Sequence, residues 1–269
     1  MKSKESFLSI ILNWKHLSGY RNRNIIHEEE SFVVTEYNIK ASKELQNKTI
    51  LFFSDTHFKG LPFPDIELVE VINSLNADWL ICGGDLLSYL PFYDSGVNFL
   101  SRLEAKTSKI AVLGNWETRK LVWKSVEFWK KMFNDSGFHL LDNEVIDQES
   151  IKFVGLTHNR ETRILQSMDK SCFNCVISHN PGSIIRQYSN KEILNLDLIL
   201  SGHTHGGQFR IPFFGAAMTS SYYWKLFEYG LYQNDITNTK MIISGGLGYT
   251  WFNFRLFCKP EINLIRFCC

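Results

Sequence analysis

Five short polar motifs interrupt the apolar runs of this chain, and each lies where a predicted β-strand ends. In chain order they are Asp55-Thr56-His57, Gly83-Gly84-Asp85, Gly114-Asn115, Ser178-His179-Asn180-Pro181 and Gly202-His203-Thr204-His205-Gly206-Gly207. In open α/β sheets, ligands bind at the carboxyl ends of the strands. We therefore expect the motifs to converge on one edge of a sheet, in a fold that alternates strands with helices.

The segments around the motifs have the patterns that such a fold needs. Short runs rich in β-branched and aromatic residues predict strands, and apolar residues spaced by three and four predict helices. The strands are predicted at 49–54, 79–82, 109–113, 151–156, 175–178, 196–200, 241–244 and 261–267, and the helices at 64–76, 96–105 and 118–136. This alternation alone predicts a mixed α/β protein.

The chain is predicted to form one large domain, residues 31–269, behind an N-terminal extension, residues 1–30. Its 269 residues, 44% of them apolar, are enough to bury a single sizeable core. Net charge is +1, from 29 basic and 28 acidic residues, which disfavours a nucleic-acid partner. The sequence does not predict the oligomeric state.

The extension is predicted to be helical or irregular. Several apolar residues can share one side of a helix that basic residues follow: Phe7, Leu8, Ile10, Ile11, Trp14 and Leu17. Such a helix can lie in a membrane interface or dock on the protein's own core, and the pattern does not decide between them. No secretory signal peptide and no run of ~20 apolar residues is found. A cytoplasmic location is therefore expected, with peripheral contact with the inner membrane as an alternative.

The motifs together offer seven candidate metal ligands. They are Asp55, His57, Asp85, Asn115, His179, His203 and His205. Carboxylate, amide oxygen and imidazole suit Mn²⁺, Fe or Zn²⁺ rather than a soft metal bound by thiolates. Seven ligands exceed what one tetrahedral ion needs. They suit two ions that share a carboxylate, as in enzymes that displace a phosphoryl group in line.

The order of these motifs resembles the calcineurin-like metallophosphoesterase superfamily over residues 55–205. The resemblance continues through Gly206-Gly207-Gln208, Arg210-Ile211-Pro212, Gly215, Gly245-Gly246-Leu247-Gly248 and Arg255. That second part is similar to a subgroup of bacterial lipid and cell-envelope phosphodiesterases, which includes a UDP-2,3-diacylglucosamine pyrophosphohydrolase of lipid A synthesis. The resemblance implies a four-layer α/β/β/α sandwich.

The resemblance also implies a role for each ligand. Asp55, His57 and His205 would hold one divalent ion. Asn115, His179 and His203 would hold a second, and Asp85 would bridge the two. Asp85, Asn115 and His179 are accordingly the expected catalytic residues, and two Mn²⁺ ions the expected cofactor, with Fe or Zn²⁺ as alternatives.

One position departs from the family pattern. Histidine usually follows the Gly-Asn motif and is thought to protonate the leaving group, but this chain has Trp116, followed by Glu117. An indole donates a hydrogen bond but is not a general acid near neutral pH. A phosphate monoester leaves more easily than an alkoxide, since its second pKa is ~6. Trp116 therefore favours a pyrophosphate substrate, and a slow or inactive enzyme is the alternative.

Aromatic residues and one leucine in the flanking loops point to a lipid-like, phosphorylated substrate. They are Phe58, Leu61 and Phe63 after the first motif, and Phe213, Phe214, Tyr222, Tyr223, Trp224 and Phe227 after the last. These side chains can form a groove for acyl chains or pack beneath their own loops. Lys59, Arg119 and Arg210 are candidate diphosphate ligands.

The leading predicted reaction is cleavage of UDP-2,3-diacylglucosamine to UMP and a lipid monophosphate. The alternatives are a phosphodiesterase for another envelope lipid or cell-wall phosphodiester, and a metal-binding scaffold without activity.

Overall fold

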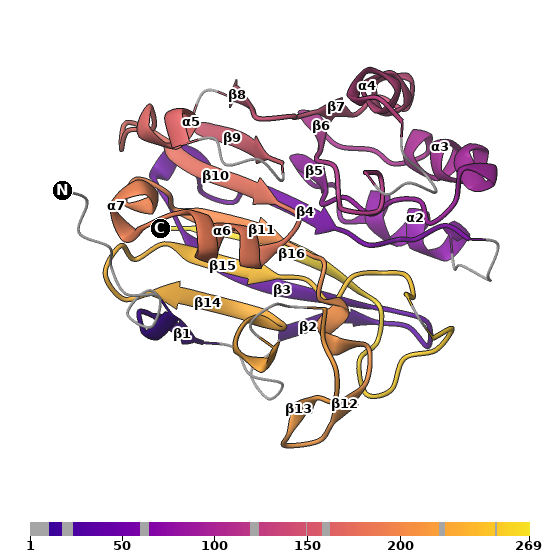
Figure 1. Ribbon diagram of the computed structural model, residues 1–269. Coiled ribbons are helices and arrows are strands. Elements are labelled where there is room, and N and C mark those ends of the chain that lie inside the picture. The colour runs from indigo at the N-terminus through magenta and orange to yellow at the C-terminus, as the bar shows by residue number, and fades with distance from the viewer. Residues whose placement is uncertain are drawn as a thin grey trace.

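Two seven-stranded sheets form the centre of the computed structural model, which describes residues 11–17, 24–59, 65–118, 124–148, 150–157, 162–220, 224–250 and 252–269 (Figure 1). The first sheet has the order β2 (Asn24–Glu28), β3 (Val33–Lys40), β16 (Glu261–Cys268), β4 (Thr49–Phe53), β5 (Trp79–Cys82), β6 (Ser108–Ala111) and β7 (His139–Leu140). The second has the order β1 (Trp14–His16), β14 (Gly230–Asn234), β15 (Lys240–Ile243), β11 (Leu198–Ser201), β10 (Phe173–Ser178), β9 (Ile151–Leu156) and β8 (Glu144–Gln148). Strands β12 (Arg210–Ile211) and β13 (Gly215–Ala216) form a separate hairpin.

Alternating side chains divide the interior into three apolar layers. In β4, Ile50 and Phe52 face the other sheet, while Leu51 and Phe53 face outward. Helices α2 (Asp65–Ser74), α3 (Tyr93–Ser101) and α4 (Val126–Asp135) cover the outer face of the first sheet. Helices α5 (Thr162–Gln166), α6 (Pro181–Gln187) and α7 (Asn190–Ile193) cover the second. Single 3₁₀ turns occur at Lys43–Leu45, Leu90–Phe92, His205–Gly207 and Trp224–Phe227. The predicted four-layer α/β/β/α sandwich is confirmed.

Parallel pairing places the polar motifs at one end of both sheets. Strands β4, β5 and β6 run parallel in the first sheet, and β9, β10, β11 and β15 run parallel in the second. The first three motifs follow β4, β5 and β6, and the last two follow β10 and β11.

The amphipathic helix predicted from Phe7 to Leu17 does not continue through Trp14 in the described residues. Residues 11 and 12 are helical, but 14–16 form edge strand β1 against β14, and 24–28 form edge strand β2 against β3. The cause is tertiary, because each sheet edge offers backbone groups that the N-terminal segment pairs with. Residues 24–28 therefore belong to the sandwich, and residues 1–10 lie outside the described part of the chain. In the described residues, no helix is long and apolar enough to cross a membrane.

The strand β1 gives a direct test of this arrangement. Trp14 is 8% exposed and packs edge-on against Phe227, with ring centroids 6.4 Å apart. We expect Trp14→Ala to lower the free energy of unfolding by about 3 kcal/mol, because it leaves a cavity in the outer core. Leu12→Ala, at a side chain that is 69% exposed, should change it by less than about 0.5 kcal/mol. Urea unfolding of both variants measures the difference, and equal losses would contradict it.

Candidate metal centre

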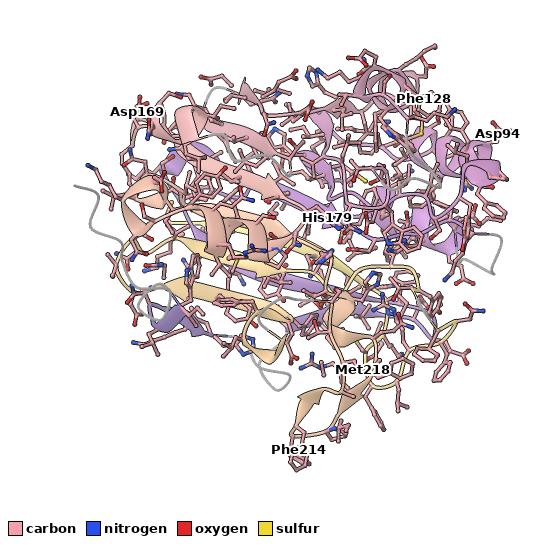
Figure 2. All side chains as sticks on the ribbon, viewed as in Figure 1. Asp94, Phe128, Asp169, His179, Phe214 and Met218 are labelled. Carbon is pink, nitrogen blue, oxygen red and sulfur yellow. The ribbon has the colours of Figure 1, made fainter. Side chains whose placement is uncertain are left out.

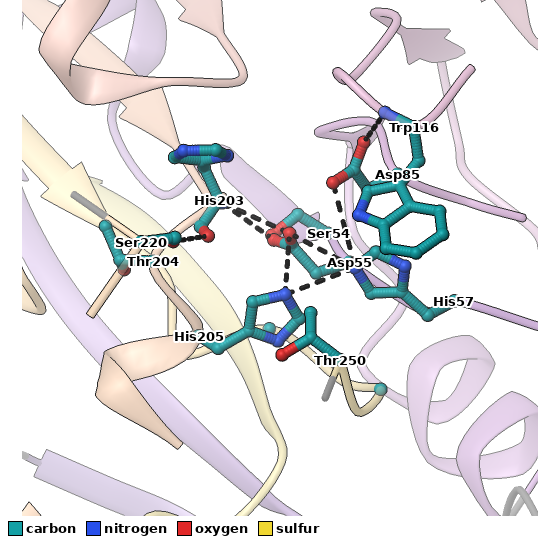
Figure 3. A network of polar contacts seen from close by, with 12 residues as sticks. Ser54, Asp55, His57, Asp85, Trp116, His203, Thr204, His205, Ser220 and Thr250 are labelled. Atoms are coloured by element: carbon teal, nitrogen blue, oxygen red, sulfur yellow. Dashed lines mark hydrogen bonds and ion pairs between the residues drawn. The ribbon is translucent and has the colours of Figure 1, made fainter. Parts of the chain in front are cut away.

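Six of the seven predicted ligands form two compact groups where the two sheets end. Figure 3 labels Asp55, His57, Asp85, His203 and His205. One group consists of Asp55, His57 and His205, and the other of Asp85, His179 and His203. Within each group, one potential ligand atom of every residue lies within 4.8 Å of those of the others. The seventh residue, Asn115, has its Oδ1 3.2 Å from His179 Nε2.

Asp85, a member of the second group, also reaches the first. Its Oδ2 is 3.7 Å from His57 Nε2 in the first group and 3.2 Å from His179 Nε2 in the second. Its Oδ1 accepts a 2.7 Å hydrogen bond from the backbone N–H of Trp116, which fixes the direction of the carboxylate. One oxygen of Asp85 therefore reaches both groups while the other is held by the loop after β6.

The first group is packed closely. His57 Nε2 lies 3.1 Å from His205 Nε2, and His205 Nε2 lies 3.4 Å from Asp55 Oδ1. These atoms all point toward one small volume, and they are nitrogen and oxygen donors. A cation in that volume would be coordinated by two imidazoles and a carboxylate, which matches the donor set of Mn²⁺, Fe or Zn²⁺.

The loops hold the ligands in backbone conformations that are costly for residues other than glycine. Five ligands have positive φ: Asp55 56°, His57 48°, Asp85 54°, His203 70° and His205 53°. Strain of this kind collects at functional sites, where the surrounding structure over-determines the backbone. Gly202 shows how tight the surroundings are, because a Cβ there would collide with Ser54 Oγ and Asp55 Oδ2.

Burial and mutual charge shift the acidities within the centre. Burial lowers the pKa of His57 to about 4 and also lowers that of His205, so both imidazoles are neutral near neutral pH. Burial raises the pKa of Asp55 to about 6. Burial would lower the pKa of His179, but Asp85 and Asp55 outweigh it and raise that pKa to about 10. Metal binding to His179 would therefore displace a proton.

A second layer of polar groups orients the ligands. Ser54 donates to Asp55 Oδ2 at 2.5 Å, and His57 Nδ1 lies 3.2 Å from Ser88 Oγ. His179 Nδ1 donates to the carbonyl of Gly83 at 2.8 Å. These contacts leave each Nε2 directed at the metal volume, as ligating imidazoles require.

Glu117 ties two ligand loops together. Its fully buried carboxylate accepts backbone N–H bonds from Asp85 at 3.1 Å, Leu86 at 2.7 Å and Gly114 at 2.8 Å. The loop after β5, which carries Asp85, is thereby fixed to the loop after β6, which carries Asn115. Glu117 is thus a positioning residue.

The three hydrogen bonds of Glu117, here called the clamp, lead to a prediction. Glu117→Gln should lower the free energy of unfolding by about 3 kcal/mol, because an amide nitrogen would face a backbone N–H that the carboxylate now satisfies. Thermal denaturation should show the loss, and Glu127→Gln on the exposed start of α4 should not. Unchanged stability in Glu117→Gln would contradict the clamp.

The arginines near the centre contact groups of the protein itself, and Arg255 Nη2 lies 3.3 Å from His205 Nδ1. Arg210, a predicted diphosphate ligand, is buried, pairs with Glu228 at 2.8 Å and donates to the carbonyl of Gly206 at 2.8 Å. Arg255 donates to the carbonyls of Gly245 at 2.7 Å and Gly248 at 2.6 Å. Arg210 therefore braces the glycine-rich loop, and its predicted role in binding diphosphate is wrong.

The other predicted substrate groups divide between described and undescribed residues. Lys59 Nζ donates to the carbonyl of Thr250 at 2.8 Å. Phe58 and Phe227 are buried and pack beneath their loops, whereas Phe213 and Phe214 are exposed. Leu61, Phe63, Arg119, Tyr222 and Tyr223, and the side chain of Trp224, lie outside what the structure describes.

A cavity of about 260 Å³ opens onto the metal centre. Its lining joins Asp85, Asn115, His203 and His205 to the side chains Trp116, Phe209, Met218 and Phe252 and to the hydroxyl residues Thr219, Ser220 and Thr250. The Trp116 ring stands edge-on to His57, with centroids 5.2 Å apart. Trp116 therefore lies beside the ligands, where it can touch a substrate.

Sequence reasoning missed Ser88, which has no motif around it. It included Gln208 in the family resemblance but gave it no role. Gln208 links the loops by donating to the carbonyls of Phe252 at 2.7 Å and Phe254 at 2.9 Å. Ser54 was within reach, since it directly precedes the first ligand.

Comparison with known proteins places these residues within one family profile. The profile described as calcineurin-like phosphoesterase matches residues 48–207, a segment that contains all seven candidate ligands. The chain is 26% identical to the uncharacterized metallophosphoesterase YkuE of Bacillus subtilis over 255 residues, 88% of this chain and 86% of YkuE. It is 28% identical to the uncharacterized protein YpbG of the same species over 82% of this chain and 81% of YpbG. It is 26% identical to the phosphodiesterase YaeI of Escherichia coli over 81% of each chain.

Proposed function

The chain belongs to the calcineurin-like phosphoesterase family, and on that premise we propose that it is a binuclear metal-dependent hydrolase that cleaves the pyrophosphate bond of a lipid-linked nucleotide. The observation that carries the proposal is the place of Asp85, whose Oδ2 lies within 3.7 Å of His57 Nε2 and 3.2 Å of His179 Nε2. A carboxylate between two ligand groups is what two ions that act on one phosphoryl group require.

We assign the ligands as two sets. Asp55, His57 and His205 would hold one ion, Asn115, His179 and His203 the other, and Asp85 both. The two compact groups support this assignment. Mn²⁺ is the first candidate, and Fe or Zn²⁺ are alternatives, because all donors are oxygen or imidazole nitrogen.

The residues of the chain prepare the centre for an anionic substrate. The two ions, when bound, would supply positive charge at the phosphoryl oxygens and make water more acidic. Asp85 and Asp55 are held rigidly by Trp116 N–H and by Ser54 and His203 N–H, so little reorganisation is needed during reaction. Asn115 and His203 line the cavity beside Trp116, where they can orient the phosphate.

Trp116 decides the class of leaving group in this proposal. Its indole N–H can donate to a phosphate oxygen but cannot deliver a proton near neutral pH. The chain therefore suits a leaving group that needs no acid, such as a nucleotide monophosphate. Phe209, Met218 and Phe252 in the cavity wall support an apolar portion of the substrate. UDP-2,3-diacylglucosamine, cleaved to UMP and a lipid monophosphate, combines both features.

The second candidate is a phosphodiesterase for another envelope lipid or cell-wall phosphodiester. The name of YaeI, a phosphodiesterase, favours this reading. The two candidates differ in their leaving groups. An alkoxide needs a proton from a general acid in order to leave, whereas a nucleotide monophosphate does not.

Release of UMP from UDP-2,3-diacylglucosamine by the purified protein with Mn²⁺ tests the proposal. We expect release that a chelator abolishes and that Mn²⁺ restores. Cleavage of an aryl phosphodiester without UMP release would retain the phosphoesterase and discard the lipid-nucleotide substrate. If the protein binds metal but cleaves neither substrate, the result would favour the inactive metal-binding scaffold.

A further inference from the structure

A short hairpin carries the most exposed aromatic side chains among the described residues. Strands β12 and β13 project from the sandwich, and the turn between them presents Phe213, 88% exposed, and Phe214, 72% exposed (Figure 2). Exposed apolar groups gathered on one feature indicate an interaction surface. The hairpin tip is therefore a candidate interaction surface.

The tip is part of a larger apolar surface that reaches the metal centre. This apolar rim consists of Ile211, Phe213, Phe214, Met218, Phe252 and Phe254, all of them exposed. Met218 and Phe252 also line the cavity that contains Asp85 and His203. In Figure 2, Met218 lies between Phe214 at the tip and His179 at the centre. Because Met218 and Phe252 belong to both surfaces, a ligand that contacts the apolar rim can extend into the cavity.

The base of the apolar rim is rigid. Phe209 packs edge-on against Phe252 at 5.1 Å and Phe254 at 4.9 Å between ring centroids. Gln208 fixes the loop that carries Phe252 and Phe254 by donating hydrogen bonds to their backbone carbonyls. Phe213 has φ of 71°, a conformation that a bulky residue seldom adopts.

Size and charge favour a lipid surface over a protein partner. Six side chains are few beside the roughly 20–30 residues that each partner contributes to a stable protein interface. Membrane insertion needs only a few aromatic side chains at the level of the headgroups. The sequence of residues 206–227, which includes the hairpin, contains no Asp or Glu, so the hairpin adds no acidic charge that would repel an anionic headgroup.

We propose that the apolar rim inserts into the boundary between headgroups and acyl chains of a lipid bilayer and directs the metal-centre cavity toward it. The tip, Phe213 and Phe214, enters first, and Met218 and Phe252 form the path from the bilayer into the cavity. The proposal rests on the proposed function for one point only, that the substrate is a membrane lipid.

Co-sedimentation with vesicles of phosphatidylethanolamine and phosphatidylglycerol tests the surface without any turnover. The variant is Phe213→Asn with Phe214→Ser, since asparagine tolerates positive φ. We expect it to weaken vesicle binding by about 10- to 100-fold, because two aromatic side chains no longer leave water. Phe214→Trp alone should keep binding, because tryptophan favours membrane interfaces.

A matched control removes two exposed apolar side chains at the other end of the sheets. Leu194 precedes β11 and Ile236 follows β14, so both lie opposite the metal centre. Leu194→Ser with Ile236→Ser should bind vesicles like the wild type. Wild-type protein that does not sediment with vesicles, or a hairpin variant that binds equally well, would overturn the proposal.

The outcomes separate this inference from the proposed function. The hairpin variant should cleave a soluble aryl phosphodiester at the wild-type rate, yet cleave the lipid substrate in vesicles at least about 10-fold more slowly. Vesicle binding without any cleavage would keep the surface and discard the function. Cleavage of detergent-dissolved lipid without vesicle binding would keep the proposed function and discard the membrane surface. A concentration-dependent dimer that the hairpin variant loses would assign the apolar rim to a second copy and overturn the lipid surface.

Discussion

Asp85→Asn should reduce kcat/KM by about 10³-fold or more, the largest loss that we expect from a single substitution. The amide keeps the shape of the side chain and can still accept the N–H of Trp116. It removes the negative charge that lies between the two ligand groups, and with it the means to hold two cations side by side. A loss of this size corresponds to about 4 kcal/mol of transition-state stabilisation.

Metal content and activity together measure this effect. Asp85→Asn should bind less than the wild-type amount of Mn²⁺ by elemental analysis, while its circular dichroism spectrum stays that of the wild type. Asp135→Asn, an exposed partner of Lys131 on α4, is the matched control and should change neither quantity. Full activity in Asp85→Asn would exclude a bridging role.

Trp116→His should raise the cleavage of an alkyl phosphodiester by about 100-fold, the second of the large effects. General acid catalysis contributes roughly 10²–10⁴-fold when the acid can reach the leaving group. Trp116 lines the cavity next to Asp85 and Asn115, so an imidazole in its place can approach a leaving oxygen. Cleavage of a diphosphate should change by less than about 10-fold, since its leaving group needs no proton.

The ratio of the two rates is the quantity to measure, because it cancels any general loss of stability. Trp116→Phe is the control, since it keeps an aromatic ring but has no ring nitrogen. Trp116→Phe should cleave the alkyl phosphodiester as slowly as the wild-type protein does. If Trp116→His improves neither substrate, the leaving-group explanation for this position is wrong.

The seven candidate ligands could be found in the sequence because each has a local signal. Polar residues that closely follow an apolar run, as Asp55 and His203 do, mark the carboxyl end of a strand whatever the strand pairs with. Strands β5 and β9 were predicted with their observed bounds because each is a short, mostly buried apolar run.

Elements that depend on pairing partners were harder to predict. Strands β1 and β8 lie at sheet edges with mixed polar sequences, and only their neighbours make them strands. Within the helix predicted at 118–136, the described helix is Val126–Asp135, and Ser125 accepts the N–H of Phe128 as its N-cap. That serine is the start signal that apolar spacing alone overlooked. Strand β3 alternates between the two faces, and a search for period two would have found it.

The place of β16 in the first sheet sets an order on how the chain can fold. Strands β3 and β4 are consecutive in sequence, yet β16 lies between them, parallel to one and antiparallel to the other. During synthesis the first sheet therefore cannot be completed until β16 has been made. Until then β3 and β4 each keep one unpaired backbone edge, while more than two hundred further residues are synthesised. Such long-range closure is slow. The nascent chain is consequently exposed to aggregation for most of its synthesis, and the slowest folding phase of this protein should be the insertion of β16.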